Sequence, residues 1–257
     1  MSEPRVCILQ ADGINCDHEL FYAFEKYGAQ PKFVHVNKLR SGQDTLRNYQ
    51  ILAIPGGFSY GDDIASGKIL AIELVSSIRG QIEKFIEKKG LVIGICNGFQ
   101  ALVRTGLLPF GNLGQMDATL SQNKSGHFEC RWVKIRTEKS ACKFLPAGLV
   151  AEVAVNHGEG DFYSTKEVIN KVEREKLVTF RYIDQKGKPT MNYPQNPNGS
   201  TNAIAGVCDP SGRIIGLMPH PEKFIEKTQN PNWRRPDFED LQAGFVIKNM
   251  VEFLKRS

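Results

Sequence analysis

The sequence lacks any long apolar run, and no stretch approaches the roughly 20 residues that a membrane-spanning helix needs. Its first residues, MSEPRVCILQ, also lack the charged segment and apolar core of a secretory signal. A strong charge of one sign is missing too, because 33 Lys and Arg stand against 28 Asp and Glu, and the basic residues are dispersed. We therefore expect a cytoplasmic protein without a membrane or nucleic-acid partner.

The cysteines form no C-x-x-C pair, and this disfavours a zinc site or a disulfide framework. They are widely spaced, at Cys7, Cys16, Cys96, Cys130, Cys142 and Cys208. Both common phosphate-binding loops, G-x-G-x-x-G and G-x-x-x-x-G-K-[ST], are also missing. We expect reduced thiols, no metal and no nucleotide bound by this chain.

The first half of the chain has a βαβ rhythm. Short apolar runs at residues 5–10, 33–36 and 51–54 predict strands, and the apolar spacing over residues 17–27 predicts a helix. No linker interrupts the sequence, so we expect one domain over residues 1–257. In parallel sheets of this kind, ligands bind beyond the carboxyl ends of the strands.

The rest of the chain is predicted to complete a three-layer αβα domain. Apolar residues recur at helical spacing over residues 69–85, which predicts one long amphipathic helix, and residues 238–254 predict another. Residues 192–202 read as a loop. The remaining strands, expected as antiparallel additions to a mostly parallel central sheet, are residues 128–136, 149–155, 177–183, 203–208 and 214–218.

The segment LVIGICNGFQALVRTG changes from strand to helix at Cys96. Gly94 and Gly98 flank it, which gives the sulfur version of the nucleophile elbow, a tight turn that pushes one side chain outward. The helix that follows would favour the thiolate through its free N–H groups and its dipole. The alternative is that Cys96 is a small buried apolar residue, as free cysteines usually are.

A candidate base lies in the segment MPHPE. His220 follows an expected strand between two prolines, and Glu222 comes two residues later, on the same side if the chain is extended. Glu222 could fix the ring tautomer while the other ring nitrogen faces the thiol, as in a catalytic triad. The alternative is a surface turn with an incidental pair.

The loop PGGFSYGDDIASG follows the strand at residues 51–54. Paired glycines can expose backbone N–H groups to a ligand, which an oxyanion hole requires, although a plain surface turn has the same composition.

Together, GICNGFQ, PGGFSYGDD and the late HPE resemble the class I glutamine amidotransferases. With NHGEG, YPQNPNGSTNAIAG and GLMPHPE, the chain is similar over nearly its whole length to the glutaminase subunits of phosphoribosylformylglycinamidine synthase, a purine-pathway enzyme.

The resemblance implies an ammonia-releasing glutaminase with the triad Cys96, His220 and Glu222. The backbone N–H groups of Gly57 and Asn97 would form the oxyanion hole. Substrate contacts carried over from the family are Phe58, Gln100, Asn156 and Gly158. It also implies a separate synthetase subunit, possibly with a small bridging subunit, that receives the ammonia and holds the ATP and Mg²⁺.

Three alternatives remain at this point. The chain could serve another class I amidotransferase, which the NPNGS and NHGEG segments disfavour. It could be a non-catalytic regulatory subunit, which the complete triad disfavours. It could be an elbow-cysteine hydrolase or chaperone, which the late H-x-E disfavours. The partner of the basic segment at residues 232–235 is left open.

Overall fold

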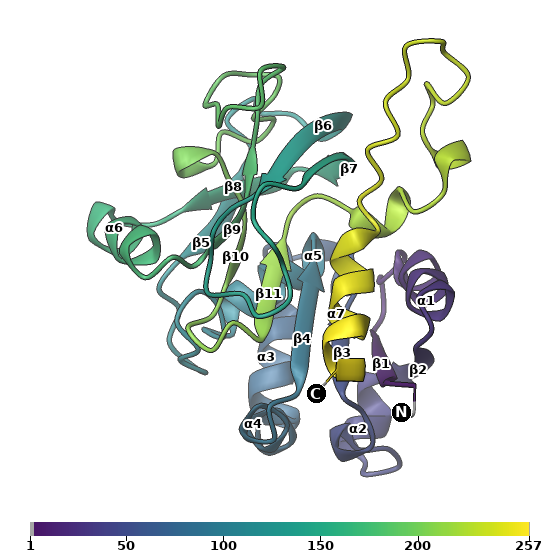
Figure 1. Ribbon diagram of the computed structural model, residues 1–257. Coiled ribbons are helices and arrows are strands. Elements are labelled where there is room, and N and C mark those ends of the chain that lie inside the picture. Colours follow the sequence, from purple (N-terminus) through teal and green to yellow (C-terminus); the bar gives the residue numbers. More distant parts are fainter. Residues whose placement is uncertain (1–2, 257) are drawn as a thin grey trace.

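The computed structural model in Figure 1 describes residues 3–256, so residues 1, 2 and 257 of the predicted domain lie outside the described residues. Nine strands form one sheet in the order β2-β1-β3-β4-β11-β10-β9-β6-β7. The first five run parallel: β2 (Gln30–His35), β1 (Arg5–Gln10), β3 (Ile51–Ile54), β4 (Leu91–Ile95) and β11 (Ile214–Leu217). The other four pair antiparallel: β10 (Ile204–Cys208), β9 (Val178–Tyr182), β6 (Glu129–Thr137) and β7 (Val150–His157).

Helices cover both faces of the parallel part of the sheet (Figure 1). On one face α1 (Asp17–Lys26) lies beside α7 (Phe245–Arg256), and on the other α3 (Lys68–Ser77) lies beside α5 (Asn97–Arg104). Every residue of β3 and β4 is buried, as continuous apolar runs require in a sheet covered on both faces. The predicted fold class, a three-layer αβα domain with added antiparallel strands, is confirmed.

Several short elements were not predicted. Strands β5 (Thr119–Gln122) and β8 (Glu159–Tyr163) form a separate antiparallel pair. Helix α6 (Lys166–Arg174) begins at Thr165, whose hydroxyl accepts a hydrogen bond from the N–H of Val168. The others are α2 (Val36–Arg40), η1 (Leu46–Asn48), η2 (Ser59–Asp62), η3 (Thr201–Ala203), η4 (Pro221–Lys223) and η5 (Lys227–Gln229).

The prediction of one helix over residues 69–85 is wrong. The segment forms two helices, α3 and α4 (Arg79–Glu87), with Ile78 between them at φ −128°, ψ 16°. Ile78 is buried in the core. The apolar spacing continues across the break because both helices bury apolar residues, so the spacing alone could not locate the bend.

The prediction that the last helix begins at residue 238 is also wrong, because α7 begins at Phe245. The preceding segment is held by tertiary hydrogen bonds instead: the carbonyl of Leu241 accepts from the N–H of Glu152 on β7, and Ala243 donates to the carbonyl of Phe224. These bonds replace the helical ones that the apolar pattern suggested. None of the helices among residues 3–256 has the length and apolar character that crossing a bilayer requires.

The turn after β4 depends on a close approach between α5 and β3. A Cβ on Gly98 would lie 2.0 Å from the carbonyl oxygen of Ile54, whereas a Cβ on Gly80 in α4 would meet nothing within 4 Å.

We therefore predict that Gly98→Ala lowers the free energy of unfolding by about 1–3 kcal/mol or more, because backbone must move to admit the methyl group. The matched control Gly80→Ala should be neutral or stabilising by up to about 1 kcal/mol. Urea unfolding of both variants measures the difference. Equal stabilities would show that the approach of α5 to β3 is not tight.

Candidate active site

The backbone at Cys96 turns sharply between β4 and α5. Its φ of 51° and ψ of −107° are rarely adopted by a residue with a side chain. Hydrogen bonds hold both sides of the turn: the N–H of Cys96 donates to the carbonyl of Leu217 at 2.9 Å, and the N–H of Gln100 donates to the carbonyl of Cys96 at 3.0 Å. The strand, turn and helix predicted around Cys96 are therefore present.

The thiol of Cys96 does not face outward as predicted. The residue is only 4% exposed, and its Sγ lies 3.7 Å from the carbonyl oxygen of Asn156 on β7. Strand β7 belongs to the antiparallel half of the sheet, so that half covers the nucleophile position at the end of the parallel half. Sequence reasoning treated the two halves separately and missed this cover.

His220 and Glu222 form a short buried pair, with Nδ1 of the imidazole 2.6 Å from Oε1 of the carboxylate. The pair meets through the 3-10 turn η4, which starts at Pro221, and not along the extended chain that the sequence suggested. The N–H of His220 donates to the carbonyl of Ala154, which attaches the segment to β7.

Burial opposes a charge on His220, but the carboxylate of Glu222 and then the thiols of Cys96 and Cys16 outweigh burial. The pKa of the His220 imidazole therefore lies well above its ordinary value. Nearby His157 behaves in the opposite way, because burial and the positive charge of His220 lower its pKa to about 3. The ring of His220 can therefore carry a positive charge while the ring of His157 remains neutral.

The loop after β3 runs beside the turn. The N–H of Phe58 donates to the carbonyl of Gly13, and Gly57 forms an isolated antiparallel bridge with Ile14. Among residues 3–256, we find no acceptor for the N–H of Gly57. The N–H of Asn97 at the first position of α5 has no acceptor within its own helix. Two backbone donors are thus available on either side of Cys96.

The side chain of Asn97 joins this loop to α5. It is fully buried, and its Oδ1 accepts from the N–H of Ser59 at 3.2 Å and from the Ser59 hydroxyl. Its Nδ2 donates to Asp62 at 3.0 Å and to Oε1 of Gln100 at 3.1 Å. The loop is therefore held by the residue that follows the nucleophile, a contact that sequence reasoning did not predict.

The other predicted site residues lie on segments around Cys96. Gln100 is buried and donates to the carbonyl of Glu159, so both polar atoms of its amide are bonded within the protein. Asn156 accepts a hydrogen bond from the thiol of Cys130, and the carbonyl of Gly158 accepts from the N–H of Asn123. Phe58 is 44% exposed and stacks on Phe128.

The loop predicted over residues 192–202 contains a buried polar cluster rather than a solvated turn. The hydroxyl of Ser200 donates to the carbonyl of Gly160 and accepts from the N–H of Phe162, while Asn198 donates to the hydroxyl of Tyr182. Buried polar groups need such partners. The NPNGS segment thus holds β8, which begins within the NHGEG segment.

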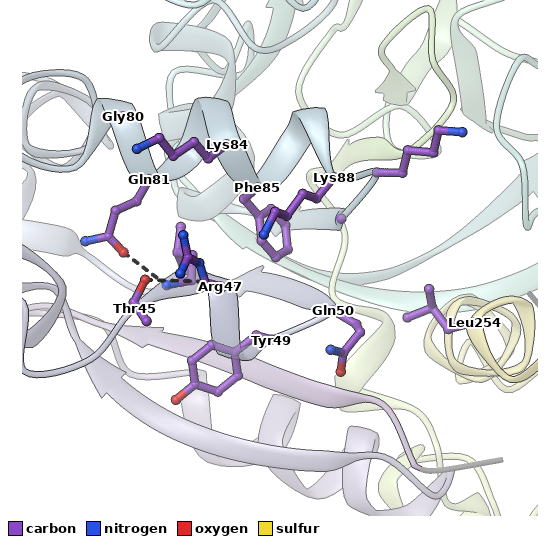
Figure 2. Close-up of a pocket in the computed structure, with 13 residues that line it drawn as sticks. Thr45, Arg47, Tyr49, Gln50, Gly80, Gln81, Lys84, Phe85, Lys88 and Leu254 are labelled. Atoms are coloured by element: carbon purple, nitrogen blue, oxygen red, sulfur yellow. Dashed lines mark hydrogen bonds between the residues drawn. The ribbon is translucent and has the colours of Figure 1, made fainter.

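A cavity of about 480 Å³ lies elsewhere, between η1 and α4 at the amino ends of β3 and β4 (Figure 2). Arg47, Lys84 and Lys88 line it together with Tyr49 and Phe85. Its lining contains no cysteine, histidine or carboxylate, and it opens at the opposite edge of the sheet from Cys96. It therefore lacks the thiol, imidazole and carboxylate of the proposed triad.

Comparisons with known proteins identify the family of this chain. The model of the CobB/CobQ-like glutamine amidotransferase domain matches residues 3–254. The chain is 44% identical to "Phosphoribosylformylglycinamidine synthase subunit PurQ" of Dehalococcoides mccartyi, covering 100% of both chains, and 38% identical to the subunit of that name from Methanococcus maripaludis, covering 97% of this chain and 93% of the relative.

Among solved structures, "Structure of PurLQS from Thermotoga maritima" contains a chain that matches with a TM-score of 0.75 and 30% identity, covering 98% of this chain and 99% of that one. The chain therefore belongs to the glutamine amidotransferase family and, within it, to the family of PurQ subunits of phosphoribosylformylglycinamidine synthase.

Proposed function

We propose that this chain releases ammonia from glutamine and passes it to a synthetase that makes formylglycinamidine ribonucleotide in purine biosynthesis. The observation that carries the proposal is the placement of Cys96 on a strained turn beside the buried pair of His220 and Glu222. Such an arrangement of thiol, imidazole and carboxylate suits acyl transfer.

In the first step the sulfur of Cys96 attacks the side-chain amide carbon of glutamine. The carbonyl oxygen becomes an oxyanion, to which the N–H groups of Gly57 and Asn97 would donate, and the absence of another acceptor for the Gly57 N–H among residues 3–256 supports this role. Phe58, Gln100 and the segment from Asn156 to Gly158 are the proposed substrate contacts.

In the second step the protonated imidazole of His220 gives its proton to the leaving nitrogen, and ammonia departs from a thioester on Cys96. Water then attacks the thioester, with His220 as the base, and glutamate is released. Glu222 accepts from Nδ1 of His220, which keeps the ring oriented and favours its charged form.

The ammonia is useful only if a synthetase receives it. The solved relative is titled PurLQS, so we propose that this chain works in an assembly of that kind, with a synthetase subunit and a small third subunit. ATP and Mg²⁺ would be bound by the synthetase and not by this chain. We also propose a cytoplasmic location, where the six free cysteines stay reduced.

We predict that Cys96→Ala lowers glutamine-dependent synthesis by about 10⁴-fold or more, because the nucleophile is lost. The same variant, assembled with its synthetase, should still support synthesis from an ammonium salt at the wild-type rate. The measurement is product formation with each nitrogen source. If synthesis from glutamine survives the substitution, Cys96 is not the nucleophile, and if both sources fail, the assembly is damaged.

We predict that Glu222→Gln lowers the pKa of His220, because the carboxylate is the main group that raises it against burial. Since the leaving nitrogen needs a proton from His220, the alkaline limb of the pH profile of kcat should move to lower pH. NMR titration of the His220 ring and steady-state assays over pH measure both effects.

His220→Ala is the comparison variant, and it should lose about 10²–10⁴-fold in kcat, more than Glu222→Gln loses, because it removes proton transfer itself. Thermal melts check that both variants fold. An unchanged His220 pKa in Glu222→Gln, or greater activity in His220→Ala, would refute the assigned roles.

A further inference from the structure

A second cysteine, Cys16, lies beside the triad although the proposed reaction does not use it. Its Sγ, one ring nitrogen of His220 and one carboxylate oxygen of Glu222 all lie within 4.8 Å of one another. All three residues are buried, and Cys16 is 5% exposed. They come from opposite ends of the sequence, so spacing along the chain could not reveal the cluster.

The parallel sheet explains how Cys16 comes to this place. Cys16 stands at the N-cap of α1, after β1, just as Cys96 stands at the N-cap of α5, after β4. Strand β3 lies between β1 and β4, and its loop separates the two cysteines. The N–H of Cys16 donates to the carbonyl of Gly56 in that loop.

Gly56 lets these groups approach one another. A Cβ at Gly56 would lie 2.7 Å from Cε1 of His220, 3.3 Å from Cβ of Cys96 and 3.5 Å from Sγ of Cys16. Both cysteines and the imidazole therefore surround one point, and only a residue without a side chain leaves it open.

Two ligand atoms in the cluster are unsatisfied. Among residues 3–256, Nε2 of His220 and Oε2 of Glu222 are buried and have no hydrogen-bond partner of ordinary geometry. Buried polar atoms are usually paired, so these atoms are free to contact a bound group. The nearby Sγ of Cys16 donates to the side chain of its neighbour Asn15, at 3.3 Å.

We propose that Cys16, His220 and Glu222 bind Zn²⁺, with the fourth position of the metal open, and that zinc reversibly inhibits the enzyme. Thiolate, imidazole and carboxylate are the ligands that zinc takes in tetrahedral sites, whereas Mg²⁺ and Ca²⁺ prefer oxygen alone. The thiolate of Cys16 and the carboxylate of Glu222 carry two negative charges, which one zinc ion balances.

Zinc binding and catalysis exclude each other in this arrangement. The metal occupies the imidazole that transfers the proton, and its binding releases the thiol proton of Cys16. The geometry of the cluster supports the metal site by itself, whereas the predicted loss of activity depends on the proposed function. The two parts therefore need separate readouts.

The first readout is metal binding by the purified full chain, kept reduced with a non-thiol reductant. Co²⁺, which takes the same ligands, should give a thiolate-to-metal charge-transfer band, and Zn²⁺ should displace it with one ion bound per chain. Cys16→Ser should weaken zinc binding at least about tenfold, since even groups outside the ligand set cost 10–100-fold when lost. The matched control is Cys130→Ser, which removes an exposed thiol outside the cluster and should bind as the wild type does.

The second readout is glutamine hydrolysis. The rates of the wild type and of Cys16→Ser are each measured first in a chelator, and micromolar zinc should inhibit Cys16→Ser, relative to its own rate in chelator, at least about tenfold less than it inhibits the wild type. Mg²⁺ should not inhibit either protein.

Equal zinc affinity of Cys16→Ser and wild type, or a cobalt spectrum without a thiolate band, would overturn the site. Absence of glutaminase activity even in chelator would instead contradict the proposed function. If Cys16→Ser does not fold, Cys16→Ala serves in both assays.

Discussion

The backbone conformation of Cys96 is the constraint on which the rest of the site depends. A residue with a side chain at φ 51°, ψ −107° stores strain of about 1–3 kcal/mol, and surrounding structure must hold it there. The hydrogen bond from Cys96 to β11 and the first turn of α5 do so, while Gly98 lets the helix approach β3 closely. Relaxing this turn would move the sulfur away from His220 and separate the two backbone donors.

Polar contacts connect the turn at Cys96 to other segments around the site. Asn97, the next residue, holds the loop of Gly57 through Ser59 and Asp62, and it contacts Gln100. Gln100 in turn holds the carbonyl of Glu159 at the start of β8. Because Ser59, Asn97 and Gln100 are buried, a contact broken between them leaves a polar group unsatisfied, which costs about 1–3 kcal/mol. The network is therefore a preorganised support for charge at the turn.

Much of the fold and of the site could be predicted from the sequence, because these features depend on residues that are close together in the chain. The strand-to-helix change at Cys96, the parallel strands before it and the H-x-E pair depend on neighbouring residues, and periodicity reports such features well. The burial of Cys96 could not be predicted, because Asn156 reaches it from a strand that is distant in sequence. The late start of α7 escaped for a similar reason, since tertiary hydrogen bonds hold the segment before it. The break at Ile78 escaped because the apolar spacing continues across it.

The same limit applies to Cys16. Its position between an expected strand and an expected helix was visible, but its approach to His220 depends on β1, β3 and β4 being neighbours in the sheet and on Gly56 leaving space between them. The wide spacing of the cysteines argued against a metal, because that argument considers only ligands that are close in sequence. Sheet order is what brings residues 16 and 220 together.

The central claim is that the thiol of Cys96, and no other thiol, is the nucleophile. Its most direct test is peptide mass spectrometry after inactivation by an electrophilic glutamine analogue, because such a reagent forms a permanent bond with the attacking sulfur. The account predicts one adduct per chain, located on Cys96, with protection by glutamine. Full inactivation with the adduct on Cys16, Cys130 or any other residue would contradict it.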